Sequence, residues 1–167
     1  GVEVLFSVAQ RSSTRLIAHR PGLQMQKSII KKFRIDIRSG NESALSLMLG
    51  RDGSIARQGN GKLPADMASV LGNSDGSIFS SLIEMLDERI FPHADVYDHP
   101  HKIGIPISYS IVFLGQGQET AIFEFRFGSG TTDVGELLPF FDGFISQAVA
   151  LTNDWYAAEK SRIHTGQ

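Results

Sequence analysis

Five side chains that can ligate a metal ion fall within nine residues of one another in the stretch FPHADVYDHPHKIG, residues 91–104. They are His93, Asp95, Asp98, His99 and His101. Imidazole and carboxylate groups are common zinc ligands, and a catalytic zinc site combines three of them with an open position for water. If His99 and His101 begin a strand, their alternate spacing directs both imidazoles to one side. With Asp95, Asp98 or His93 as the third group, such a site would support metal-dependent hydrolysis.

A connecting loop explains the same stretch. Asp and Pro are favoured in turns, and Pro100 can bend the two flanking histidines apart. No HExxH helix accompanies them, and short motif matches are weak evidence on their own. We therefore favour a loop that runs into a strand and keep a divalent metal such as zinc as the alternative.

A second candidate site is the glycine-rich segment GRDGSIARQGNGK, residues 50–62. Its polar side chains, which we expect to be exposed around a hairpin, include Arg51, Asp52, Arg57, Gln58 and Lys62. Loops on a rigid scaffold often contact a partner or ligand. Turn chemistry accounts for most of this composition without any binding role, and we favour that interpretation.

Several other chemistries find no support in the sequence. The chain has no cysteine and no G-x-S-x-G nucleophile motif. The segment FGSGTTD lacks the GK[ST] of a phosphate loop, and Asp133 and Glu136 would repel an anion there. These two residues resemble a capping box at the start of a helix.

The apolar spacing predicts five strands and two main helices. Strands are expected over residues 29–38, 43–49, 54–59, 103–115 and 120–127, and helices over 75–91 and from 133 to about 155. A further short helix is expected over residues 64–72, with Pro64 in its first turn and Gly72 at its end.

Two hairpin registers follow from the requirement that the apolar rows share one face. The first pairs Ile37 with Leu45 across a three-residue loop, residues 40–42. The second pairs Ile111 with Phe123 across residues 116–118, with Gly117 or a neighbour in the left-handed conformation.

These elements predict an α+β domain of two layers, an antiparallel sheet of about five strands in the order β-β-β-α-β-β-α with the helices on one face. Residues 29–160 would form this single domain, preceded by a basic arm or extension, residues 1–28, and followed by a tail, residues 161–167. The opposite sheet face would carry polar side chains and no aromatic residue, which disfavours RNA binding by base stacking. Its expected residues are Lys32, Arg34, Asp36, Arg38, Ser46, Met48, Ser108, Ser110, Glu124 and Arg126.

Charge is unevenly distributed along the chain. Residues 1–38 contain eight Lys or Arg and two Asp or Glu, a balance of +6. Because the whole chain has a net charge of −2, residues 39–167 carry −8. The basic arm could neutralise the acidic body within one subunit or between two, which we favour over nucleic-acid binding. The chain has no apolar run long enough to span a membrane, and its lack of cysteine fits a cytoplasmic protein.

Three functional hypotheses remain open. We favour a non-catalytic domain that binds another protein or itself as a homo-oligomer. The alternatives are a metal-dependent hydrolase at residues 93–101 and a binder of a small ligand between the sheet and the long helix. The ligand pocket would be lined by Tyr109, Phe123, Phe125, Phe141 and Trp155.

Overall fold

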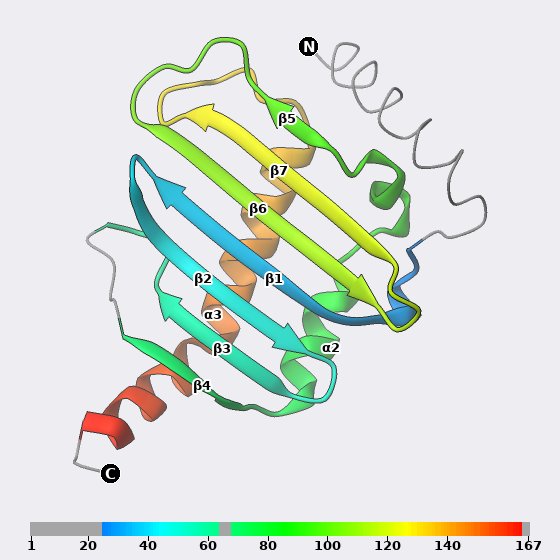
Figure 1. The fold of residues 1–167 in the computed structure, drawn as a ribbon, viewed down its shortest axis with the longest axis vertical. Helices are drawn as coiled ribbons and strands as arrows, with labels where there is room; N and C mark the ends of the chain where they lie inside the picture. The colour runs from blue at the N-terminus through cyan, green and yellow to red at the C-terminus, as the bar shows by residue number, and fades with distance from the viewer. Residues whose placement is uncertain (1–24, 64–67, 165–167) are drawn as a thin grey trace.

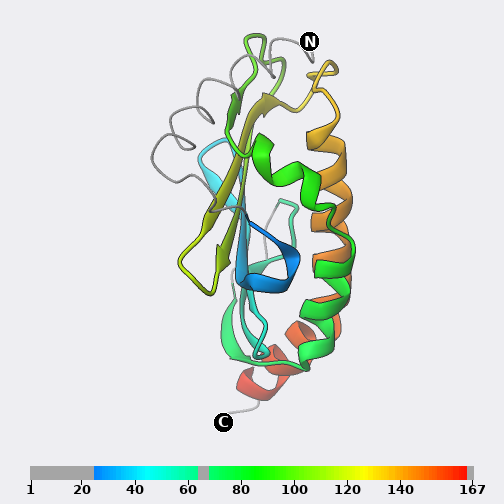
Figure 2. The ribbon, with the colours of Figure 1, turned by 90° about the vertical axis from the view of Figure 1, so that its right-hand side faces the viewer.

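The computed structural model describes residues 25–63 and 68–164, which form a sheet covered on one face by helices (Figures 1 and 2). Of the basic arm expected over residues 1–28, residues 1–24 lie outside the described residues. In chain order the elements are η1 (Lys27–Ile29), β1 (Ile30–Ser39), β2 (Glu42–Gly50), β3 (Ser54–Gly59), β4 (Ser69–Asn73), α2 (Gly76–Glu84), η2 (Glu88–His93), β5 (Val96–Asp98), β6 (Pro106–Gly115), β7 (Thr120–Gly128) and α3 (Leu137–His164). The helix α3 therefore continues into the segment expected to be a tail.

Among the described residues the sheet has seven strands in the order β4-β3-β2-β1-β6-β7-β5, so the expectation of about five was too low. All neighbouring pairs are antiparallel except β5 with β7. The α+β class and the placement of α2 and α3 on one side of the sheet are confirmed (Figure 2).

The short helix expected over residues 64–72 is wrong for residues 69–72, which belong to the strand β4, and residues 64–67 lie outside the described part of the chain. Val70 is buried against the helix layer while Leu71 points outward, the alternation of a half-buried strand. Gly72 lies within β4, where it packs closely against α3 and does not end a helix: a Cβ there would lie 3.2 Å from the ring of Trp155. The indole Nε1 of Trp155 donates to the carbonyl of Asn73 at 3.0 Å and holds β4 to α3.

Both predicted hairpin pairings are confirmed, although the first loop differs. Ile37 pairs with Leu45, but β2 starts at Glu42, and a bulge at Ala44 absorbs the extra residue expected in the loop. Ile111 pairs with Phe123 across the expected three-residue loop, in which Gln118 takes the left-handed conformation at φ 67°.

The helix expected over residues 75–91 is interrupted. Asp75 caps α2 by accepting a hydrogen bond from the Ser77 N–H at 2.9 Å, and α2 ends at Glu84. Asp87 then caps the separate turn η2 through the Arg89 N–H at 2.9 Å. The helix α3 begins four residues after Asp133, so the capping box expected there does not start it.

Phenylalanine rings fill the space between the two layers. Phe33 from β1, Phe113 from β6 and Phe144 from α3 lie with ring centroids 5.3–6.0 Å apart. All three side chains are buried. Such ring pairs contribute about 1 kcal/mol each beyond the burial of their apolar area, so this cluster fixes how α3 crosses the sheet.

A buried arginine joins the other end of α3 to the sheet. Arg57 on β3 is 2% exposed, and its Nη1 donates to the Thr152 hydroxyl at 2.9 Å and to the Val149 carbonyl at 3.2 Å. Its guanidinium also stacks over the ring of Tyr156 at 4.4 Å. The Tyr156 hydroxyl in turn accepts from the Gly59 N–H at 3.1 Å. The expectation that Arg57 is exposed is therefore wrong.

Gly59 and Gly61 form a matched pair for testing how closely β3 approaches β2. Both have positive φ, 88° and 91°, but a Cβ on Gly59 would lie 2.3 Å from the Ala44 carbonyl oxygen, while a Cβ on Gly61 meets nothing within 4 Å. We expect Gly61→Ala to lower the free energy of unfolding by about 1 kcal/mol and Gly59→Ala by about 3 kcal/mol or more. Urea denaturation followed by circular dichroism measures both; equal losses would contradict the close approach.

Candidate functional site

The histidine-rich stretch begins as a strand and then becomes a loop. Tyr97 on β5 pairs with Phe125 on β7, and the two rings stack at 5.4 Å on the helix side of the sheet. The His99 N–H extends this pairing by donating to the Arg126 carbonyl at 2.9 Å. The following loop is held by the Thr131 hydroxyl, which accepts from the Ile103 N–H at 3.2 Å. The strand expected from residue 103 starts only at Pro106, so His99 and His101 lie in a loop.

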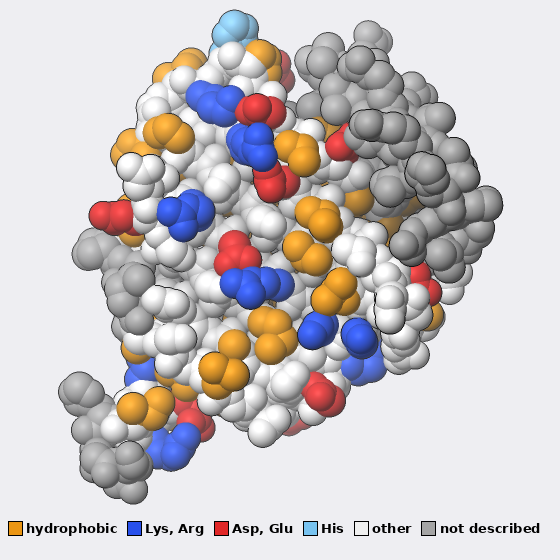
Figure 3. Space-filling view, viewed as in Figure 1, with side chains coloured by type: hydrophobic (Ala, Val, Ile, Leu, Met, Phe, Trp, Pro, Cys, Tyr) orange, Lys and Arg blue, Asp and Glu red, His pale blue; other side chains and the backbone are white. Residues whose placement is uncertain are grey.

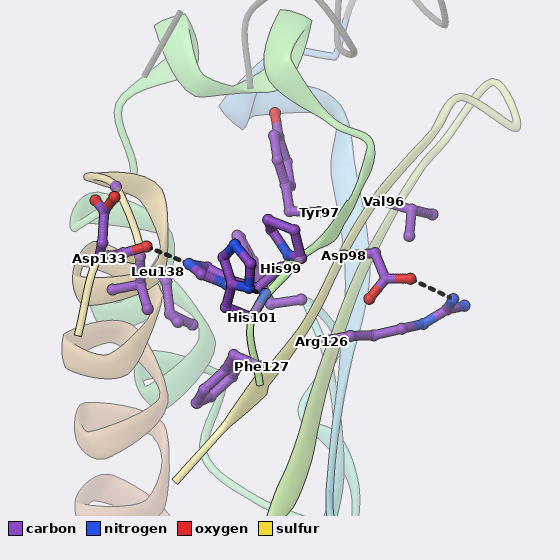
Figure 4. Close-up of a pocket in the computed structure, with 13 residues that line it drawn as sticks. Val96, Tyr97, Asp98, His99, His101, Arg126, Phe127, Asp133 and Leu138 are labelled. Carbon is purple, nitrogen blue, oxygen red and sulfur yellow. Dashed lines mark hydrogen bonds and ion pairs between the residues drawn. The ribbon is translucent and has the colours of Figure 1, made fainter. Parts of the chain in front are cut away.

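Both ring nitrogens of His99 are hydrogen-bonded. Nδ1 accepts from the His101 backbone N–H at 3.0 Å and so carries no proton. Nε2 lies 2.6 Å from the carbonyl oxygen of Asp133 and must therefore donate (Figure 4). The neutral imidazole thus links the loop after β5 to the segment before α3, and a metal ion could bind it only by displacing one of these bonds.

The other proposed metal ligands point in different directions. Asp98 lies on the opposite side of the sheet, where Lys102 at 2.5 Å and Arg126 at 3.8 Å hold its pKa below its usual value, mainly through the hydrogen bond from Lys102. Asp95 Oδ1 accepts from the Val96 N–H at 2.8 Å. Across residues 25–63 and 68–164 no three His, Asp or Glu side chains are grouped to hold a metal.

The remaining two of the five proposed metal ligands are His93 and His101. The backbone carbonyl of His93 accepts a hydrogen bond from the Tyr97 hydroxyl. Burial raises the pKa of that hydroxyl, with a smaller contribution from the charge of Asp95. His101 is exposed, and its ring centroid lies 6.5 Å from that of His99.

A pocket of about 380 Å³ opens between this loop and the start of α3 (Figure 4). Tyr97, Phe125, Phe127, Val134 and Leu138 supply most of its apolar lining, with His99, His101 and Asp133 among the polar residues. Of the aromatic residues expected to line a pocket, only Phe125 does so, and Phe123 and Phe141 are fully buried in the core. The three residues of β5 are too few to indicate that Tyr97 faces inward, and its direction follows from the pairing with β7.

Three of the five residues proposed for the hairpin site hold the fold together. Arg51 donates from Nε to the Ile30 carbonyl at 2.8 Å and ties the β2–β3 turn to β1. Asp52 accepts from the Ser54 N–H at 3.0 Å within that turn, and Arg57 is buried as described above. Gln58 lies on the open sheet face, and Lys62 is exposed.

The open face of the sheet, which the helices leave uncovered, carries an apolar row that sequence analysis did not anticipate (Figure 3). Pairing places one residue from each of six adjacent strands in line: Leu71, Ala56, Met48, Arg34, Val112 and Ile122. We call these six residues the cross-sheet row. Leu71 is 76% and Ile122 47% exposed. Arg34 and Met48 were expected on this face, but Leu71, Ala56, Val112 and Ile122 were not, so the face is less polar than expected.

Charged residues lie within and beside the cross-sheet row, and several of them are paired with one another. Arg34 donates from Nε to Asp36 at 2.7 Å, and this hydrogen bond raises the pKa of Arg34. Arg126 contacts both Glu124 and Asp98. The open face therefore presents a mixture of both signs and not a single-sign patch.

No family model, curated protein or solved structure matches the chain. None of the helices in the described part of the chain has the length and apolar character that crossing a membrane requires.

The hydrogen bonds of His99 predict unequal effects of two histidine substitutions. We expect His99→Ala to lower the free energy of unfolding by about 1–2 kcal/mol, because it removes both links described above. His101→Ala keeps the backbone N–H and should change stability by less than about 0.5 kcal/mol. Thermal and urea unfolding of both variants measure these changes in stability. A larger loss of stability in His101→Ala than in His99→Ala would contradict the hydrogen bonds assigned to His99.

The same geometry predicts that the protein retains no stoichiometric zinc. Coordination at His99 would break a hydrogen bond, and Asp98 is turned away and paired with Lys102. Mass spectrometry of digested protein after dialysis with zinc measures the retained metal. Zinc retained by the wild type and lost in a His99→Ala/His101→Ala variant would show instead that the loop rearranges around a metal.

Proposed function

We propose that the chain is a non-catalytic assembly domain whose open sheet face binds the same face of a second copy. The observation that carries this proposal is the cross-sheet row, in which large apolar side chains remain exposed at both ends. Apolar residues at the centre of a patch with a polar rim are typical of protein–protein interfaces.

The shape of the row suits a twofold contact. A twofold axis that lies in the plane of the contact can place a straight row of residues against the same row of a second copy. The axis can run along the row, or it can cross the row at its middle. The two copies would then pack row against row, as isologous interfaces do. The open faces would form a sandwich of two sheets, with the helices of each copy outside.

Electrostatics permit this contact. Arg34 interrupts the cross-sheet row, but its guanidinium is already paired with Asp36 and hydrogen-bonded to the Ser46 hydroxyl at 3.2 Å. Burying a pair that is already formed avoids leaving a lone charge without water. The aliphatic part of Arg34 can then cover neighbouring apolar surface. Mixed signs on the rim also prevent two identical faces from repelling each other.

A lysine in the row tests the assembly. We expect Ile122→Lys to raise the dissociation constant of the dimer at least tenfold, about 1.4 kcal/mol, because a charge would enter the apolar contact. Sedimentation velocity over a concentration series measures the constant. Leu151→Lys on α3 is the matched control, since Leu151 is 39% exposed and lies on the other layer.

Two results would contradict the proposal. One is a wild-type chain that stays monomeric at every concentration, and the other is a dimer that Leu151→Lys and Ile122→Lys weaken equally. A dimer lost on deletion of residues 1–24 but unaffected by Ile122→Lys would assign the contact to the basic arm.

A further inference from the structure

We propose that the pocket between β5 and the start of α3 binds an uncharged, ring-containing small molecule that carries few polar groups. The pocket volume of about 380 Å³ is within the range of small-molecule sites. Because the pocket lies beside α3 and the cross-sheet row lies on the open face of the sheet, ligand binding and assembly can be tested separately.

Apolar side chains from three segments of the chain meet at the pocket. Tyr97 comes from β5, Phe125 and Phe127 come from β7, and Val134 and Leu138 come from the approach to α3 and its first turn. The rings of Tyr97 and Phe125 are nearly parallel, with an angle of 14° between their planes. Aromatic rings pack favourably against other rings, so this lining suits a ring-containing body.

The polar groups at the base of the pocket are already hydrogen-bonded within the protein. The Tyr97 hydroxyl donates to the His93 carbonyl. The two ring nitrogens of His99 are bonded to the His101 N–H and the Asp133 carbonyl. A ligand with many polar groups would lose its hydrogen bonds to water here without gaining replacements. The site therefore favours a ligand with few such groups.

The charged residues that line the pocket are paired or turned away. Asp98 lies 2.5 Å from Lys102 and 3.8 Å from Arg126, and Arg126 also contacts Glu124. These two acidic and two basic side chains balance in charge. Figure 4 shows the carboxylate of Asp133 directed away from the imidazoles. An ion of either sign would thus give up water in the pocket without meeting an opposite charge of its own, which favours an uncharged ligand.

The imidazole of His101 is the polar side chain that remains for a ligand. It is exposed and lines the pocket, and its ring makes no hydrogen bond within residues 25–63 and 68–164. A neutral imidazole has one nitrogen that donates and one that accepts. One hydroxyl or N–H group of the ligand can therefore be satisfied at the exposed side of the pocket, with the rings inside.

Three probes that share one ring system test the charge preference on the whole chain, residues 1–167. They are naphthalen-2-ylmethanol, naphthalen-2-ylmethylammonium and 2-naphthoate, which are neutral, cationic and anionic at pH 7. Titration followed by amide chemical shifts in ¹⁵N-labelled protein gives both the affinity and the location. We expect the neutral probe to bind about tenfold more tightly than either ion, with the largest shifts at residues 97–101 and 133–138.

A larger side chain in the pocket provides the matched test. Val134→Phe introduces a ring into the volume that the ligand would occupy and should weaken binding of naphthalen-2-ylmethanol at least about tenfold. Leu151→Phe introduces the same ring at an exposed position further along α3 and should leave binding unchanged.

Five outcomes would overturn the proposal. The first three are tightest binding of either ion, equal affinity for all three probes, and no shifts at millimolar probe. The fourth is shifts located elsewhere in the chain. The fifth is shifts at the pocket that appear when the protein is concentrated without probe, which would assign the pocket to a second copy. The wild-type titrations decide all five, even if Val134→Phe folds poorly.

Discussion

The alternation of apolar and polar residues in β1 is the constraint on which the rest of the structure depends. β1 lies at the centre of the sheet, paired with β2 on one side and β6 on the other. Phe33, Ile35 and Ile37 all point into the core, which places Arg34 and Asp36 on the open face. A shift of one residue in either pairing would exchange these faces. The cross-sheet row exists only because both neighbouring strands keep this register.

Elements with a strong local pattern could be predicted from the sequence, and those that depend on tertiary contacts could not. The two hairpin pairings followed from apolar alternation in strands of nine or ten residues. β4 and β5 have five and three residues, too few to establish a period, and they are strands because β3 and β7 offer free edges beside them. Gly72 was misinterpreted as a helix end because its close neighbour, the ring of Trp155, is distant in sequence.

The candidate site shows the same division. The sequence identified the histidine-rich stretch, and His99 and His101 do line the pocket. Nothing in residues 91–104 indicates that the partner of His99 would be the carbonyl of Asp133, because that contact requires β7 and the approach to α3 to be in place. On β7, Phe125 and Arg126 both line the pocket, and the side chain of Arg126 extends to the open face, where it contacts Glu124 and Asp98. The two surfaces that we have described are therefore separated by the thickness of one strand.

In the described part of the chain the sheet ends on its two shortest strands, β4 and β5, which affects how copies of the chain can meet. Unpaired N–H and C=O groups on an edge strand recruit other strands and allow sheets to extend without limit. The edge strand β4 has only five residues, and the edge strand β5 has only three and runs parallel to β7. Backbone pairing between copies is correspondingly weak at both ends. Short edges thus limit fibre-like growth, and a lasting contact between copies has to come from side chains on a face.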